Sequence, residues 1–346
     1  MVELNGKKIL VTFLMHLGDL TLTTPFIHAL RKAAPDAHIT MLVDEKLKDV
    51  VLFNPYLDEV VTIDKKGRDN SILSLWACSR HLSKLDFDVL INLHPNERCS
   101  FIDAMTSVKL RTGTTHKIFK WFWDVFTPLD RSMHAADMYL DVLQQLGVQD
   151  LSNNGLEIFP GEEHFLEAEL FWQEQNITDQ DKLIGFNIGS AVPTKRWPPE
   201  RFAEVADIFA AKGYKTVFFG GTMDEEMVAE ATGYMQTRPI IATGHFAIGG
   251  LAAAMRRCCL IITNDSGPMH VAISQKVPIV AMYGPSNPKL YGPYTKDAVI
   301  VTAQPPCQGC ADGMKHSCDD LQCMSRMTVK QVVEAADTML ERGVEK

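Results

Sequence analysis

The amino-acid sequence predicts an α/β protein with two parallel β-sheets, each covered by helices. Short apolar runs of strand length alternate with amphipathic segments of helix length, which is the pattern of βαβ units. The same alternation occurs once in each half of the chain. The length of 346 residues also exceeds what one hydrophobic core usually supports. We therefore expect two Rossmann-like domains whose sheets face a central cleft.

In the first half, apolar runs rich in β-branched residues predict buried parallel strands. These strands are expected at 7–14, 37–43, 60–63 and 88–93. Residues 15–19 are predicted to form a loop, and a helix is expected at 20–33. A second helix at 134–146 is predicted to end at Gly147. The Asn, Gly and Pro residues of 151–161 indicate a linker between the domains.

The second half repeats this order of elements. Strands are predicted at 183–188, 215–219, 260–263 and 278–283, and helices at 162–174, 199–212, 224–235, from about 270 to 275, and at 328–342. The two domains are therefore expected to cover residues 1–160 and 161–327.

Composition and charge exclude several classes of protein. The net charge of −9 disfavours sequence-independent binding to nucleic acid, so no nucleic-acid partner is expected. No secretory signal is recognisable, and no apolar run approaches the roughly 18 to 20 residues of a membrane span. We expect a soluble cytoplasmic protein.

Residues 264–270 are the leading candidate for an anion site. They follow an apolar strand and open a helix, whose N-terminus offers unpaired N–H groups and positive partial charge to a diphosphate. Gly267 allows a close approach of the backbone, Ser266 offers a hydroxyl, and His270 lies one turn into the helix. In the alternative interpretation, Asp265 or Ser266 simply caps an ordinary helix.

Two further turns follow predicted strands and carry polar groups. Lys195 and Arg196 lie a few residues beyond Ser190, and two adjacent cations can neutralise a diphosphate. The alternative is a surface basic pair. Thr222 and the acids 224–226, which include Asp224 and Glu225, follow Gly220-Gly221. A carboxylate at such a place can bond ribose hydroxyls, or can stabilise the N-terminus of a helix.

Asp19 is the leading catalytic candidate. A carboxylate that follows the first strand can act as a general base toward a hydroxyl. The alternative is that Asp19 caps the helix expected at residue 20. His16 and Gly18 stand beside it. Lys117 and Lys120 add positive charge next to the aromatic run 121–123, where they meet either an anionic acceptor or only solvent; the aromatic residues are expected in the core or in a lid.

Four cysteines cluster near the C-terminus. They are Cys307, Cys310, Cys318 and Cys323. Close thiolate pairs suit a structural Zn or Fe, although this spacing fits no standard finger. Reduced thiols packed together, or disulfides formed in air, are the alternatives.

Taken together, these motifs resemble glycosyltransferase family 9, the lipopolysaccharide heptosyltransferases. The features that carry the resemblance span the chain: Leu17-Gly18-Asp19 with Thr24-Pro25, Gly189-Ser190 with Thr194-Lys195-Arg196-Trp197-Pro198, Gly220-Gly221, Asn264 to His270, Tyr283-Gly284-Pro285-Ser286, and Cys323-Met324.

The resemblance implies a GT-B fold and an inverting transfer of heptose from ADP-L-glycero-β-D-manno-heptose to the inner core of lipopolysaccharide. Asp19 would be the general base, and no metal would take part in the chemical step. Ser190 and Lys195 would hold the diphosphate, an acid after Gly221 would meet the ribose, and residues 265–270 would line the donor. The helix 328–346 would pack back on the first domain.

The departures from the family pattern leave alternatives open. Ser266 replaces a frequent Thr, which keeps the hydroxyl, and His16 replaces a frequent Ser on the acceptor side. A related group that heptosylates proteins carries iron bound by cysteines. A protein acceptor, another donor sugar, or an epimerase or hydrolase of nucleotide sugars are therefore alternatives, and contact with the inner membrane is expected to be peripheral.

Overall fold

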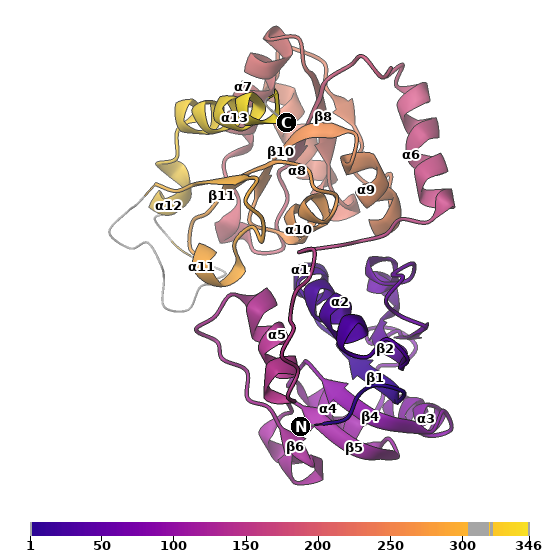
Figure 1. Ribbon diagram of the computed structural model, residues 1–346. Helices are drawn as coiled ribbons and strands as arrows, with labels where there is room; N and C mark the ends of the chain where they lie inside the picture. The colour runs from indigo at the N-terminus through magenta and orange to yellow at the C-terminus, as the bar shows by residue number, and fades with distance from the viewer. Residues whose placement is uncertain (1, 304–317, 319–320, 345–346) are drawn as a thin grey trace. The chain divides into compact units, whose positions relative to one another are not determined.

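The computed structural model describes residues 2–303, 318 and 321–344 of the chain. The chain forms two compact units, Met1–Phe159 and Pro160–Lys346, so the boundary lies next to the predicted division after residue 160. Each unit contains a six-stranded sheet, and the strand pairs in both sheets are parallel (Figure 1). The predicted α/β class with two Rossmann-like sheets is confirmed.

The sheet of the first unit has the strand order β3-β2-β1-β4-β5-β6. Its strands are β1 (Lys8–Thr12), β2 (His38–Asp44), β3 (Glu59–Ile63), β4 (Phe87–Asn92), β5 (Val108–Gly113) and β6 (Val125–Phe126). The first four were predicted. β5 was not, because Lys109 and Arg111 interrupt its apolar residues, and β6 has only two residues.

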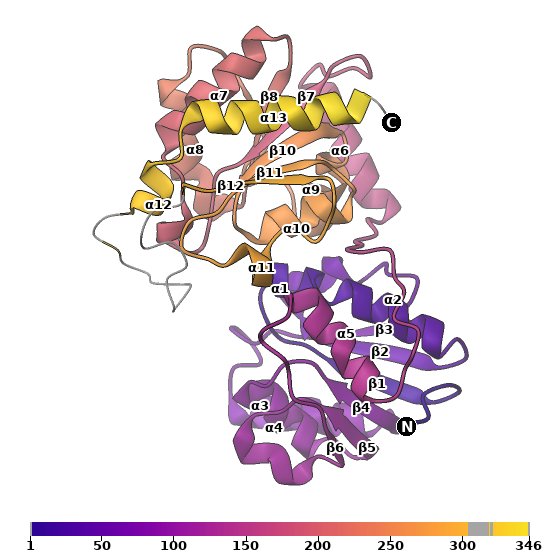
Figure 2. The ribbon, with the colours of Figure 1, turned by 60° about the vertical axis from the view of Figure 1, so that its left-hand side comes forward.

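Helices cover both faces of this sheet. They are α1 (Leu17–Thr21), α2 (Thr24–Ala33), α3 (Ile72–Ser83), α4 (Glu97–Met105) and α5 (Ala135–Gln145), with the 3-10 helices η1 (Glu45–Val50) and η2 (Lys117–Phe122). The helices α2 and α5 pack together on one face, and α3 and α4 on the other (Figure 2). The sequence did not indicate α3 or α4.

The predicted loop 15–19 and single helix 20–33 are wrong. The chain forms two helices, α1 and α2, that are separated at Leu22 and Thr23. Pro25 stands in the first turn of α2, where a missing N–H is tolerated, and it would interrupt a continuous helix. The Thr23 hydroxyl donates to the Leu20 carbonyl at 2.7 Å, which satisfies a buried carbonyl at the break.

The second unit has the matching strand order β12-β11-β10-β7-β8-β9. Its strands are β7 (Leu183–Asn187), β8 (Lys215–Phe219), β9 (Ile240–Ile241), β10 (Cys258–Asn264), β11 (Ile279–Met282) and β12 (Ala298–Val301). Its helices are α6 (Glu162–Glu174), α7 (Pro199–Ala211), α8 (Glu225–Tyr234), α9 (Ile248–Met255), α10 (Gly267–Ser274), α11 (Pro288–Tyr291), α12 (Gln322–Ser325) and α13 (Val329–Val344), with the 3-10 helices η3 (Pro193–Lys195) and η4 (Thr222–Asp224).

The prediction that the last helix packs on the first domain is wrong. In Figure 2, α13 lies across the sheet of the second unit. Its apolar side chains at helical spacing, Val332, Ala336 and Met339, are buried in a cluster with Leu260 of β10. This apolar stripe covers sheet surface that α7 and α8 leave open, so burial of the stripe fixes the helix on its own unit.

Each sheet has a point at which the order of strands reverses. In the first sheet this point lies between β1 and β4, where Thr12 and Asn92 are register partners. In the second it lies between β7 and β10, where Thr263 and Asn187 are partners. Ligands of such sheets bind beyond the carboxyl ends of these two strands, so the two reversal points are the places to examine.

Among the described residues, no helix combines the length and the apolar character that crossing a membrane requires.

Candidate functional site

The polar residues predicted to bind a diphosphate meet at the reversal point of the second sheet. Asn187 ends β7, and its amide donates to the hydroxyl of Ser266, beyond the end of β10, at 2.8 Å. The same amide donates to the Thr263 hydroxyl at 3.1 Å. The two loops that carry Ser190 and residues 264–270 are therefore held side by side.

Asn264 joins this segment to the loop that carries Lys195. It is fully buried, its amide donates to the Ile188 carbonyl at 2.7 Å, and its oxygen accepts the Trp197 backbone N–H at 3.1 Å. The Trp197 ring is also fully buried and donates to the Met327 carbonyl at 3.1 Å. The cationic loop is thus anchored to the core at Trp197.

Lys195 forms an ion pair inside this site. Its ammonium lies 2.7 Å from a carboxylate oxygen of Asp265, and the two side chains are only 13% and 7% exposed. The hydroxyl of Ser286 donates to the same oxygen. The burial of the Tyr283 hydroxyl, and secondly the nearby Asp265 carboxylate, raise the pKa of Tyr283 well above its usual value. Lys195 is therefore held as a fixed positive charge at the start of α10.

The N-terminus of α10 differs from an ordinary capped helix. Ser266 occupies the N-cap position, yet its side chain makes no capping hydrogen bond and instead accepts from Asn187. Pro268 has no N–H, and the Met269 N–H bonds the Ser266 carbonyl at 3.2 Å. Among the described residues, the Gly267 N–H makes no hydrogen bond to another part of the protein. The first turn of α10 therefore offers fewer free amide donors than an ordinary helix N-terminus.

The other residues predicted around the diphosphate have different surroundings. The Ser190 hydroxyl lies 3.5 Å from the Asp265 carbonyl, and Ser190 is buried. The Arg196 guanidinium donates to the Ser190 carbonyl at 2.9 Å, so it braces this loop. His270 is 4% exposed and lies one turn into α10.

The three acids after Gly221 are not equivalent. Asp224 is buried, and its carboxylate accepts the Gly221 N–H at 2.9 Å. A side-chain carbon on Gly189 would overlap this carboxylate, so the glycine lets Asp224 close the gap between the ends of β7 and β8. Glu225 and Thr222 are exposed on the same turn. Asp224 therefore shapes this loop, whereas Glu225 and Glu226 are both exposed to solvent.

Asp19 lies at the reversal point of the first sheet. It occupies the first turn of α1 and is half-buried, and His16 is the N-cap residue but makes no side-chain capping bond. Gly18 lies between them. The ammonium of Lys65 donates to the carbonyls of Leu14 and Met15 at 2.8 and 3.0 Å and thereby holds the segment that leads into α1.

His94 is a polar residue near this point that the sequence analysis did not select. It follows β4 and is 7% exposed, and its Nδ1 atom is enclosed without a hydrogen-bond partner among the described residues. Burial lowers the pKa of His94 to about 4, with smaller contributions from Lys65 and His16. The imidazole is therefore neutral near pH 7. A His-Pro pair directly after a buried strand was the available signal.

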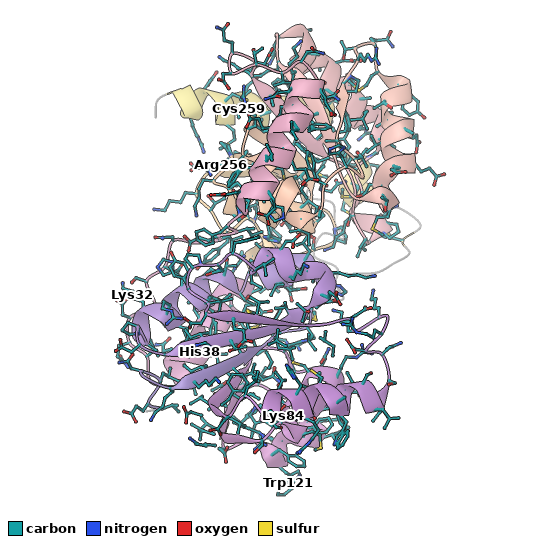
Figure 3. The ribbon with its side chains drawn as sticks, turned by 90° about the vertical axis from the view of Figure 1, so that its right-hand side faces the viewer. Lys32, His38, Lys84, Trp121, Arg256 and Cys259 are labelled. Carbon is teal, nitrogen blue, oxygen red and sulfur yellow. The ribbon has the colours of Figure 1, made fainter. Side chains whose placement is uncertain are left out.

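The two lysines predicted on the acceptor side lie elsewhere on the first unit. Lys117 and Lys120 belong to η2, which connects β5 to β6 at the outer edge of the sheet. The Lys120 ammonium lies 4.3 Å from the centre of the Phe126 ring. Of the adjacent aromatic residues, which were expected in the core or in a lid, only Trp123 is buried in the core; Trp121 is 95% exposed (Figure 3).

The cysteine cluster falls largely outside the part of the chain that the structure describes. Cys307 and Cys310 are not among the described residues, Cys318 is exposed, and Cys323 is buried in α12. Within the described residues, no group of three or more His, Cys, Asp or Glu side chains is arranged to hold a metal ion.

Residues missed by the sequence analysis complete the second-unit site. Asn187 and Ser286 were not selected, although each contacts a predicted residue. A polar residue at the last position of an apolar strand was the signal for Asn187, because side chains there reach the edge where ligands bind.

Comparison with known proteins identifies the family. A family model described as glycosyltransferase family 9 (heptosyltransferase) matches residues 75–318, which is more than half of the chain. A crystal structure of a family 9 glycosyl transferase from Veillonella parvula DSM 2008 is 53% identical, covers 99% of both chains and superposes with a TM-score of 0.94.

More distant relatives agree in fold. Lipopolysaccharide heptosyltransferase 3 of Escherichia coli K12 is 24% identical over 82% of this chain and 84% of its own length. The structure of E. coli ADP-heptose lps heptosyltransferase II is 21% identical, covers 97% of this chain and 99% of that chain, and has a TM-score of 0.80. The chain belongs to glycosyltransferase family 9, so it is a glycosyltransferase with the two-domain fold of that family.

Proposed function

We propose that the protein transfers heptose, with inversion, from ADP-L-glycero-β-D-manno-heptose to the inner core of lipopolysaccharide. The carrying observation is the buried Lys195–Asp265 pair beside Ser190 and the start of α10, because it fixes a cation where a donor diphosphate would bind. Family membership, and the E. coli relatives that are named as heptosyltransferases, support heptose as the sugar.

In this proposal the donor occupies the reversal point of the second sheet. Lys195, Ser190 and the Gly267 amide hold the diphosphate, and Arg196 supports their loop. Thr222 and Glu225 meet the ribose, with Asp224 shaping the turn. The remaining residues, Asp265, Ser266 and His270, line the sugar and its linkage to phosphate.

The chemical step needs a base and a stabilised leaving group. The acceptor hydroxyl oxygen forms a bond to the anomeric carbon of the donor as the bond from that carbon to the diphosphate oxygen breaks. Asp19 takes the hydroxyl proton. The negative charge that develops on ADP is balanced by Lys195 and by the N-terminus of α10. We propose that this step requires no metal ion.

The acceptor is proposed to bind the first unit. His16 and Gly18 adjoin Asp19, whereas Lys117 and Lys120 lie at the outer edge of the sheet and could meet only a distant, phosphorylated part of the core. We further propose that the protein is cytoplasmic and contacts the inner membrane peripherally, because its acceptor is lipid-linked. A family 9 enzyme with a protein acceptor or another donor sugar is the second candidate, and it is favoured by His16, since that position differs from the family pattern.

A panel of nucleotide sugars distinguishes these functions. We expect ADP-heptose to bind most tightly in calorimetry, and transfer to truncated lipopolysaccharide cores to release ADP and extend the core by one heptose. An epimerase or hydrolase would instead consume the donor without an acceptor. Transfer of heptose to a protein, with no transfer to any lipopolysaccharide core, would contradict the assignment of lipopolysaccharide as the acceptor.

Lys195→Ala should weaken ADP binding by about 1.5–3 kcal/mol, the range for a hydrogen bond to a charged group. Lys212→Ala is a matched control, because the Lys212–Asp337 ion pair is exposed and lies on α7 and α13 of the same unit. Removal of Lys195 also leaves Asp265 buried beside Ser286 without its cation. The double variant Lys195→Ala/Asp265→Asn should therefore recover stability without recovering affinity. An unchanged dissociation constant for Lys195→Ala would remove this residue from the site.

We propose that the four cysteines hold one structural Zn or Fe, since thiolates are preferred ligands of both. Protein purified without air should carry about one such ion per chain, measured by mass spectrometry of the metal. Cys318→Ser/Cys323→Ser should lose it. Cys78→Ser is the control, because burial raises the pKa of Cys78 to about 11 and keeps it a thiol. Metal-free protein in which all four thiols titrate would contradict the proposal.

A further inference from the structure

The helix α3 presents an apolar face to solvent. Ile72 and Leu73 are 73% and 78% exposed, and Trp76, one turn later, is 52% exposed. The opposite face, with Leu75 and Leu82, is buried in the core. Three large apolar side chains that adjoin on one helix are more than the scattered single exposures that ordinary surfaces show.

The exposed face is rigid. Ser71 caps α3: its hydroxyl accepts the Ser74 N–H at 3.1 Å, and the Ser74 hydroxyl accepts the Ser71 N–H at 3.1 Å. This capping box fixes the first turn, in which Ile72 and Leu73 stand. Their exposure is therefore a property of a well-formed helix rather than of a fraying end.

Cations flank this face. Lys66 precedes the helix and Arg80 lies one turn beyond Trp76; both are exposed, and neither forms an ion pair among the described residues. Arg68 also lies near, but it pairs with Glu45 and Asp69. An apolar face that contains Trp and is flanked by unpaired Lys and Arg is complementary to the headgroup region of an anionic bilayer.

The segment before α3 is hydrogen-bonded to the segment that leads to Asp19 in the same unit. The Lys65 ammonium bonds the carbonyls of Leu14 and Met15, directly before α1 and Asp19. Arg98 donates to the Asn70 side chain at 2.7 Å and to the Lys65 carbonyl. The start of α3 therefore lies at the edge of the sheet that carries Asp19, and a membrane bound by α3 would lie near this edge.

We propose that Ile72, Leu73 and Trp76, with Lys66 and Arg80, form a docking surface that binds the headgroup region of a membrane containing anionic lipid. This inference rests on the proposed function in one respect: a lipid-linked acceptor lies at the surface of a bilayer, so the enzyme must bind there to reach it. It assigns to α3 the role of holding the acceptor edge of the first unit at the lipid surface.

A second exposed apolar segment provides an internal comparison. Ile118, Trp121 and Phe122 of η2 are 62%, 95% and 46% exposed, next to Lys117 and Lys120. Figure 3 shows Trp121 projecting from the first unit. This segment belongs to the connection at the outer edge of the sheet, two strands beyond β4, so we assign docking to α3 instead.

The test is co-sedimentation of the full chain with vesicles of phosphatidylethanolamine and phosphatidylglycerol, and with vesicles of phosphatidylcholine alone. We expect binding to the anionic vesicles that weakens as salt is added. Ile72→Ser/Leu73→Ser should reduce it by about tenfold or more, since burial of these side chains drives insertion. Leu166→Ser/Leu170→Ser on α6 removes a matched exposed pair, 57% and 50% exposed, and should leave binding unchanged.

Further pairs of variants separate the two surfaces and the two forces. Trp76→Ala should weaken binding and Trp121→Ala should not. Lys66→Glu/Arg80→Glu should abolish the preference for anionic vesicles. Unchanged binding in the α3 variants, or a loss in Trp121→Ala alone, would overturn the assignment. A dimer that the α3 variants convert to monomer in light scattering would show that a second copy covers this face.

The outcome is separable from the proposed reaction. Vesicle binding is measured without donor or acceptor, so its result does not depend on which sugar is transferred. In the α3 variants, transfer to a water-soluble core fragment should match wild type, whereas transfer to lipid-anchored core in vesicles should fall. Equal loss in both assays, in variants with the circular dichroism of wild type, would show that α3 acts on catalysis itself and would contradict a docking role.

Discussion

Asp19→Asn is expected to reduce glycosyl transfer by about 10²–10⁴-fold, the usual contribution of a general base. The amide keeps the size and shape of the side chain in the first turn of α1 but cannot accept the hydroxyl proton. The proposed donor site consists of residues of the second unit. ADP binding, measured by calorimetry, should therefore stay near wild type while turnover is lost.

The alternative role of Asp19, stabilisation of the helix N-terminus, predicts a different result. Loss of that charge costs only about 0.3–1 kcal/mol of stability and leaves catalysis intact. Glu163→Gln is the matched control, since it removes a carboxylate from the first turn of α6. Activity that survives in Asp19→Asn at the level of Glu163→Gln would reduce Asp19 to a helix-stabilising residue.

Trp197→Ala is expected to destabilise the second unit by about 3–5 kcal/mol, the range for a fully buried aromatic side chain. The indole packs edge-on against Phe202 at a centroid distance of 5.0 Å and lies in the cluster that contains Met327 and Val332. Its N–H donates to the Met327 carbonyl, directly before α13. The variant therefore leaves a cavity, while the Met327 carbonyl loses the indole donor and keeps the hydrogen bond from the Arg201 guanidinium at 2.6 Å.

Chemical denaturation followed by circular dichroism measures this effect, and Trp121→Ala is its control. Trp121 is 95% exposed, so its loss should change the free energy of unfolding by less than about 0.5 kcal/mol. Trp197→Phe should fall between the two, because it keeps part of the volume but not the N–H. A Trp197→Ala variant as stable as Trp121→Ala would mean that α7 and α13 do not depend on this anchor.

Loss of the Trp197 side chain should also disturb the proposed donor site. The Trp197 backbone N–H bonds Asn264, which in turn holds the Ile188 carbonyl. A looser anchor would let the Lys195 loop move away from the start of α10. We therefore expect Trp197→Ala to weaken ADP affinity at temperatures where the variant is folded, although the Trp197 side chain is not proposed to contact ADP.

Local sequence patterns determined much of this fold. The strand 215–219 and the helix 162–174 have the predicted bounds, because an apolar run and a capped amphipathic segment are each complete signals in themselves. The glycine-rich turns at the ends of β7, β8 and β10 were located in the same way. A buried parallel strand is apolar on both faces, so it can be recognised without knowledge of its neighbours.

Other elements lacked a local signal. The helix α3 mixes exposed apolar residues with buried ones, which blurs the helical period, and β5 carries two cations among its apolar residues. The break between α1 and α2 depends on hydroxyls that satisfy carbonyls, which the hydrophobic pattern does not report. Such elements are stabilised by packing against the rest of the unit rather than by their own periodicity.

The sequence by itself determined the class of fold, the two domains, and the polar residues that follow the strands at the reversal points of the two sheets. Only the tertiary structure decided which of them lie together: Lys195 pairs with Asp265, the Asn187 amide donates to the Ser266 hydroxyl, and the Asp224 carboxylate accepts the Gly221 N–H. It also placed α13 on the second unit. The reason is physical, because local patterns encode burial and backbone geometry, whereas a site depends on contacts between residues that are about 70–80 positions apart in the chain.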